Sequence, residues 1–212
     1  ATDRDPIQKT APCVVAEVDD AGNLREVLVT PDGAETLGEP VTGADLDWCT
    51  AYWPLLDPTP GDRVEIGRTR DLAWRDLLAR IDSGMAIAVD YGHVAGARPL
   101  TGTLTAYRDG RETDPVPDGS CDLTAHVAMD SLSGHAVVSQ REALLGAGLS
   151  VALPDPALAR TAPTAYLDAL TRANARAQLV NRGSFGGFLW SITHVGADAA
   201  PETSLALADS PP

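Results

Sequence analysis

The sequence is poor in positive charge: 16 lysine and arginine residues stand against 30 aspartate and glutamate residues, for a formal net charge of −14. A chain this acidic, with a pI near 4.5, is not expected to bind nucleic acid or an anionic membrane surface. Only Lys9 is a lysine, and this bias toward arginine, together with abundant alanine, indicates a GC-rich bacterial genome.

Cysteine and long apolar runs are also scarce. Cys13, Cys49 and Cys121 are far apart and form no C-x-x-C pair, which argues against a disulfide framework and a zinc site. No histidines have close ligand spacing, so we expect no bound metal. No apolar run approaches the length of a membrane span, and no basic segment is followed by the apolar segment of a signal peptide. We therefore expect a cytoplasmic protein without membrane insertion.

Turn residues and apolar periodicity predict a mixture of strands and helices. With 212 residues, 44% of them hydrophobic, the chain is long enough for one sizeable core or for a core plus an excursion. A helix that leads directly into an apolar strand indicates a parallel or mixed sheet, and so an α/β fold. The predicted strands are 13–18 and 24–29, which form a hairpin, and 85–89, 103–107, 137–139 and 188–195. The predicted helices are 44–53, 71–81, 140–147 and 164–180, the last with Thr164 as its N-cap and Leu167 toward the core.

The most informative segment is the apolar run 85–89, which ends at Asp90, Tyr91, Gly92 and His93. A short uncharged run of this kind predicts a strand buried on both faces. In open α/β sheets, ligands bind at the carboxyl ends of such strands. Asp90 is therefore a candidate base or hydrogen-bond acceptor for a substrate, or else it caps a turn. Tyr91 and His93 would line the same crevice, unless His93 is a solvated turn residue.

Two further polar clusters follow this strand. In residues 121–127, Asp122, Thr124 and His126 alternate along an extended segment, so their side chains are expected on one face. There they would form either an Asp–His dyad or a buried polar network. Arg108, at the end of the other cluster, would contact a carboxylate or form an ordinary surface ion pair.

In order and spacing, the segments AVDYGH, GTLTAYR and DPVPDGSCDLTAHV resemble the MidA-like family of S-adenosylmethionine-dependent methyltransferases, whose mitochondrial members act as assembly factors of respiratory complex I. The similarity continues through SQREALLGAGL and the closing GGFLWSITHV, so it covers residues 11 to 195. It matches the second half of that family's usual sequence, without the half that carries the glycine-rich cofactor loop. The chain begins at Ala1 without an initiator methionine, which fits processing or a cut from a longer reading frame; the resemblance favours the cut.

The resemblance implies a fold: the C-terminal part of a class I methyltransferase-like, Rossmann-like mixed sheet, with a β-hairpin excursion and flanking helices. This domain would span residues 1–196, and residues 197–212, rich in alanine, proline and serine, would form a disordered tail.

The resemblance also implies an activity: methyl transfer from S-adenosylmethionine to a protein substrate, with an arginine side chain as the acceptor in the mitochondrial members. Asp90 and Asp122 would hold the guanidinium group. The expected catalytic residues are Asp90, Tyr91, Asp122, Thr124 and His126, and the expected substrate-binding residues are His93 and Arg108.

The chain departs from the family in two places. A motif similar to Asn-Glu-x-x-Asp-Ala-x-Pro is reduced to its closing Ala11 and Pro12, and no G-x-G turn follows a first strand. The chain alone is therefore not expected to bind S-adenosylmethionine tightly. Two functions remain open. One is the substrate-side half of a methyltransferase, active when joined to its cofactor half. The other is a non-catalytic binding or assembly protein, derived from such an enzyme by loss of that half.

Overall fold

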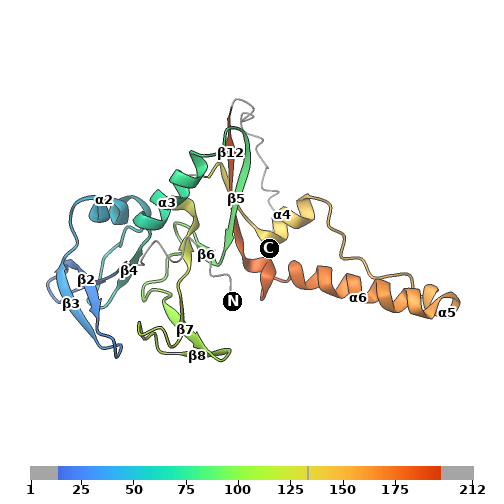
Figure 1. Cartoon of the computed structure of the whole chain (residues 1–212), viewed down its shortest axis with the longest axis horizontal. Helices are drawn as coiled ribbons and strands as arrows, with labels where there is room; N and C mark the ends of the chain where they lie inside the picture. Colours follow the sequence, from blue (N-terminus) through green and yellow to red (C-terminus); the bar gives the residue numbers. More distant parts are fainter. Residues whose placement is uncertain (1–13, 133, 197–212) are drawn as a thin grey trace.

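The protein is a mixed α/β structure with several separate sheets (Figure 1). The computed structural model describes residues 14–132 and 134–196. Within these ranges no helix combines the length and the apolar character needed to cross a membrane. The tail predicted at 197–212 lies outside the described residues.

The N-terminal sheet has four antiparallel strands. In spatial order they are β3 (Glu35–Pro40), β2 (Leu24–Val29), β1 (Val14–Val18) and β4 (Arg63–Ile66). The predicted hairpin of β1 and β2 is confirmed, and the Asp19 carboxylate closes its turn by accepting hydrogen bonds from the amides of Ala21 and Asn23, both at 2.9 Å. The sequence does not predict β3, because glycine and proline disfavour a strand; they are tolerated there because β3 lies at the sheet edge.

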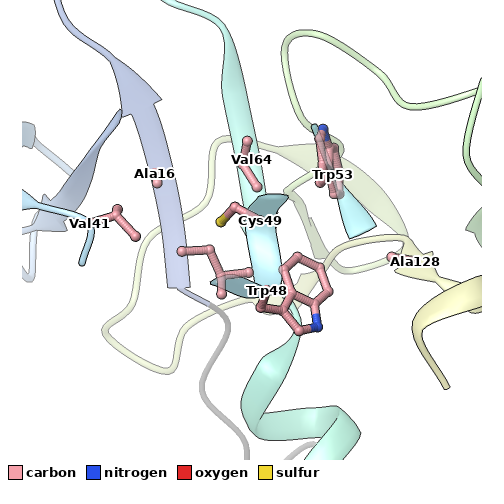
Figure 2. Packing of buried hydrophobic residues seen from close by; sticks show 8 residues of the cluster. Ala16, Val41, Trp48, Cys49, Trp53, Val64 and Ala128 are labelled. Atoms are coloured by element: carbon pink, nitrogen blue, oxygen red, sulfur yellow. The ribbon is translucent and has the colours of Figure 1, made fainter. Parts of the chain in front are cut away.

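A first core lies between the N-terminal sheet and helix α2 (Gly43–Tyr52). Trp48 and Cys49 on the helix and Trp53 just after it are buried, whereas Leu46 is 41% exposed. Figure 2 shows these side chains gathered around Val64 of β4. Burial raises the pKa of the Cys49 thiol to about 12, so this cysteine is an unreactive packing residue.

The C-terminal sheet has three strands in the order β11 (Ala136–Ser139), β12 (Leu189–Val195) and β5 (Gly84–Asp90). Helix α3 (Arg68–Leu78) covers one of its faces and contributes Trp74 to a second core. Both ladders are antiparallel, which differs from the predicted parallel or mixed sheet: β11 and β5 run in the same direction, but β12 lies between them.

The opposite face of this sheet corrects a prediction about β5. Alternate residues Met85, Ile87 and Val89 are 56%, 37% and 43% exposed, so the strand is buried on one face only. Among the described residues β5 also has no strand partner on its outer edge. Paired residues of an antiparallel ladder share a face. This face, called the open face below, exposes Met85, Ile87, Val89 and, opposite Met85, His194. Val138, Trp190 and Ile192 lie on the same face but are half-buried.

Short strands connect the two large sheets. β6 (Gly92–His93) and β10 (Val127–Ala128) form a parallel pair, and the 3-10 helix η1 (Met129–Ser131) follows β10. A small antiparallel sheet has the order β8 (Arg111–Thr113), β7 (Thr105–Arg108) and β9 (Asp122–Thr124).

Three α-helices, α4 (Gln140–Gly146), α5 (Leu158–Thr161) and α6 (Pro163–Leu179), and the 3-10 helix η2 (Phe185–Gly187) complete the described chain. Helices α5 and α6 project away from the sheets as an arm (Figure 1). The predicted long helix is confirmed, but Ala162 rather than Thr164 is its N-cap, and Leu167 is 60% exposed instead of facing the core.

Candidate functional site

The pairing of β6 with β10 brings two of the three polar clusters together at the carboxyl end of β5. Gly92 and His93 pair with Val127 and Ala128, and the Val127 amide donates a 2.9 Å hydrogen bond to the carbonyl oxygen of Tyr91. Only glycine allows this approach, because a Cβ at position 92 would lie 2.7 Å from the carbonyl oxygen of Val127. The topology therefore assembles one site from segments that are distant in the sequence.

Aromatic rings form a row at this end of β5. The centroid of Tyr91 lies 4.4 Å from that of Phe188, edge to face, and 6.1 Å from that of His126, stacked. His93 continues the row 6.4 Å from His126, and Phe185 extends it 5.8 Å beyond Phe188. Tyr91 and Phe185 are 49% and 48% exposed, so their rings can contact a planar or cationic group. Sequence reasoning did not select either phenylalanine, because Phe185 lies in a segment that indicates only a turn and Phe188 begins a predicted strand.

His93 is a buried neutral imidazole rather than a solvated turn residue. It is 7% exposed, and its Nδ1 lies 2.7 Å from Nη1 of Arg98. Because a guanidinium nitrogen can only donate, Nδ1 accepts and the ring proton lies on Nε2. Burial, and after it the charge of Arg98, lowers the pKa of His93 to about 4. In the described part of the chain Nε2 has no hydrogen-bond partner, and the ring meets Trp53 edge to face at 4.6 Å.

Arg98, which sequence reasoning did not single out, joins three segments around His93. Its guanidinium donates to the carbonyl oxygen of Tyr52 at 2.8 and 3.0 Å and to that of His93 at 2.9 Å. It also pairs with Asp130 and lies over the ring of Trp53, 5.5 Å from the centroid. Its side chain is only 8% exposed. Most of these partners lie far away in sequence, so no local pattern could reveal the role of Arg98.

The third polar cluster joins the site through Thr103. Its hydroxyl accepts a 2.7 Å hydrogen bond from the amide of His126. The loop itself is held by Glu65 of β4, a buried carboxylate that also escaped sequence reasoning because its partners are distant in the sequence.

The two predicted carboxylates, Asp90 and Asp122, lie on strands of different sheets. Asp90 ends β5 and accepts a 2.8 Å hydrogen bond from the amide of Tyr91. Asp122 and Thr124 lie on β9, where Asp122 is exposed. Within residues 14–132 and 134–196 no hydrogen bond joins Asp122 to His126, and both side chains are exposed, so neither an Asp–His dyad nor a buried polar network is seen there.

Arg108 is also placed away from the aromatic row. Its guanidinium donates to the carbonyl oxygen of Ser120 at 3.0 Å and to the hydroxyl of the same serine. These bonds join β7 to the loop before β9. Over the residues that the structure describes, no group of three histidine, cysteine, aspartate or glutamate side chains could hold a metal ion.

Comparison with known proteins places the chain in context. A family model described as "Putative S-adenosyl-L-methionine-dependent methyltransferase" matches residues 11–146. Two crystal structures of Burkholderia thailandensis proteins share the fold, each with a TM-score of 0.67 and 24% identity. One is an uncharacterized protein, of which this chain covers 53%, with 89% of this chain aligned. The other is described as a "likely methyl transferase" bound to S-adenosyl-homocysteine; the match covers 52% of it and 90% of this chain.

The chain thus spans about half the length of the solved structures that it matches. At this identity the structural likeness shows the fold alone. No curated protein matches the chain.

Proposed function

The chain belongs to the "Putative S-adenosyl-L-methionine-dependent methyltransferase" family, and from this premise we propose that it is the substrate-side half of a methyltransferase. In this proposal residues 1–196 form the C-terminal part of one Rossmann-like domain, and a second α/β half binds the cofactor. The family match includes the end of β5 and both strands that build the site, β6 and β10.

The open face is the observation that carries this proposal. Large exposed apolar surfaces on soluble proteins mark places where another protein surface packs. β5 is the edge strand of its sheet in the described part of the chain, so a further strand can pair with its outer edge. A second half packed there would bury Met85, Ile87 and Val89. It would also lie next to Asp90 and Tyr91, because these residues directly follow Val89. The length of the two solved structures, about twice that of this chain, leaves room for such a half.

The described residues alone do not fit S-adenosylmethionine. Two strands of the larger sheets lead into helices, β4 into α3 and β11 into α4. At α4 the helix start is closed by a capping box between Ser139 and Glu142. At α3 the guanidinium of Arg70 crowds Gly67, with Nη2 2.1 Å from where a Cβ would be. Neither strand is followed by a glycine-rich turn, so the proposal assigns the cofactor to the other half.

For the methyl acceptor we propose an arginine side chain of a protein substrate. The resemblance to the mitochondrial members suggests this acceptor, and the net charge of −14 would attract a cationic segment. Asp90 would hold the guanidinium group by charge-assisted hydrogen bonds, while the Tyr91 ring would stack on its plane. The binding of S-adenosyl-homocysteine by one fold relative concerns that protein and supports the cofactor proposal by analogy only.

The test begins with the reading frame that contains this chain. We expect it to encode, upstream, a strand followed by a glycine-rich turn. Isothermal titration calorimetry with S-adenosyl-homocysteine should then show binding to the complete product and none to the 212-residue chain. If neither binds, the proposal is wrong and the non-catalytic binding or assembly role becomes the better explanation.

The acceptor is tested in the complete product with a labelled methyl donor and an arginine-containing peptide. Asp90→Asn should weaken methyl transfer by about 10- to 100-fold, the effect of losing one charge-assisted hydrogen bond, while S-adenosyl-homocysteine binding stays unchanged. Asp20→Asn is the matched control, because it removes the same charge from an exposed position in the β1–β2 turn. Equal loss in both variants would contradict a specific role for Asp90.

A further inference from the structure

Glu65 is a buried carboxylate whose hydrogen bonds all run to one loop. It lies on β4 and is 4% exposed. Oε1 accepts from the amides of Thr103 and Leu104 at 2.5 and 2.6 Å, and Oε2 accepts from the Thr103 hydroxyl at 2.6 Å. A carboxylate that accepts three hydrogen bonds holds its three donors in a fixed arrangement.

The loop is shaped to bring its backbone to this carboxylate. Gly102 has φ +75°, a left-handed conformation that favours glycine, and a Cβ there would lie 3.1 Å from Oε1 of Glu65. The turn therefore places the next two amides directly on the carboxylate.

The Thr103 hydroxyl links Glu65 to His126 of the candidate site. A hydroxyl has one proton, and Glu65 accepts it; the oxygen lone pairs are then available to the amide of His126 at 2.7 Å. This is the only hydrogen bond of the His126 amide within the described residues. His126 in turn stacks on Tyr91, and its backbone directly precedes β10.

We propose that Glu65 is a positioning residue: through the Thr103 hydroxyl it fixes the backbone at His126 and so the Tyr91–His126 pair that receives the methyl acceptor. The inference rests on the proposed function for its last step only. Its structural step, from Glu65 to His126, can be measured without any activity.

Hydrogen–deuterium exchange of single amides in the 212-residue chain tests the structural step. Thr103→Val keeps the side-chain shape but removes the hydroxyl, so exchange at His126 should accelerate about five- to tenfold, as expected for one lost hydrogen bond. Exchange at Leu104 should not change, because Glu65 still accepts that amide. Thr103→Ser should restore protection at His126.

Glu65→Gln tests the same link, from Glu65 through the Thr103 hydroxyl to His126, by a change at Glu65. The amide oxygen of glutamine can still accept from the amides of Thr103 and Leu104, but its NH₂ group donates to the Thr103 hydroxyl instead of accepting from it. The hydroxyl oxygen then has less capacity for His126, whose exchange should accelerate while Leu104 stays protected. Joint loss of protection at both amides would indicate loosening of the whole loop and would overturn the inference.

Unchanged exchange at His126 in Thr103→Val would also overturn it, whatever the methyl-transfer assay shows. In the complete product of the reading frame, Thr103→Val should raise KM for the acceptor peptide several-fold and leave S-adenosyl-homocysteine binding unchanged, and Thr103→Ser should restore KM. If exchange responds as expected but the complete product transfers no methyl group, the positioning link stands and the proposed function falls.

Discussion

The two large sheets of this protein use similar strands in opposite ways. In the N-terminal sheet, Val64 of β4 is 0% exposed and packs in the first core under helix α2. In the C-terminal sheet, Val89 of β5 is 43% exposed on the open face, although α3 covers the other side of the same sheet. The same residue type in the same kind of element is thus internal in one sheet and uncovered in the other.

This difference shows which apolar surfaces the described chain covers by itself. The core under α2 is covered by the chain itself and includes the buried indole of Trp48, which donates to Asp71 at 2.7 Å, while Leu28, Val29 and Leu37 on β2 and β3 are exposed. The C-terminal sheet is complete on one face only. The candidate site lies between the two, because His93 contacts Trp53 of the first core while Tyr91 contacts Phe188 beside β12 (Figure 1).

Acid should destabilise the protein through His93, whose buried ring meets Trp53 of the first core. Its pKa falls from 6.5 to about 4 on folding, so above pH 6.5 both states are neutral and the full stability is present. Between pH 6.5 and 4 the unfolded chain binds a proton that the folded chain does not, and the free energy of unfolding should fall by up to about 3 kcal/mol. Urea unfolding at several pH values measures this.

A matched pair of variants identifies the group responsible for that pH dependence. His93→Gln should flatten the dependence between pH 6.5 and 4, because the titrating group is gone. His194→Gln, at an exposed position on β12, should leave the slope as it is in the parent chain. A slope that survives His93→Gln would assign the acid sensitivity to another group.

Alanine substitutions of Val64 and Val89 test whether the two sheets differ in how far their valines are buried. Val64→Ala removes two buried methyl groups and leaves a cavity in the first core, which should cost about 2 kcal/mol of unfolding free energy. Val89→Ala should cost less than about 0.5 kcal/mol in the 212-residue chain, because the side chain is already exposed. In the complete reading-frame product its cost should rise toward that of Val64→Ala. Equal costs in the short chain would mean that the open face is covered in solution.

Local features of the fold were predictable from the sequence, and burial by distant or external groups was not. The hairpin of β1 and β2 follows from its turn chemistry, and the position of β5 follows from its apolar run. Burial of β5 on both faces was a wrong prediction, because a residue's exposure depends on what packs over it.

The candidate site shows the same limit. The aromatic and polar residues after β5 could be found because they are contiguous, and the pairing of β6 with β10 does bring Tyr91 and His126 together. Arg98 and Glu65 could not, because each acts through partners remote in the chain. The expected Thr164 N-cap was wrong for a local reason: helix α6 begins at Pro163, so that Ala162, two residues before Thr164, is the N-cap.

The smallest expected effect concerns a feature of the C-terminal sheet that needs no partner. Helix α4 follows β11 directly, and its capping box is formed by residues three apart: the Glu142 amide donates to the Ser139 hydroxyl at 3.2 Å, and the Ser139 amide donates to the Glu142 carboxylate at 2.9 Å. Ser139→Ala should cost about 1 kcal/mol of unfolding free energy. It should also let the pKa of Glu142, which the Ser139 hydroxyl lowers, return toward its usual value.

Because this cap is local, its cost should be the same in the 212-residue chain and in the complete product, unlike that of Val89→Ala. Ser83→Ala is the control, since Ser83 is exposed and its hydroxyl makes no hydrogen bond in the described part of the chain. Urea unfolding of Ser139→Ala and Ser83→Ala, each in the 212-residue chain and in the complete product, measures these costs against the parent proteins. A cap effect that grows in the complete product would place α4, and not only the open face, in the contact with the proposed second half.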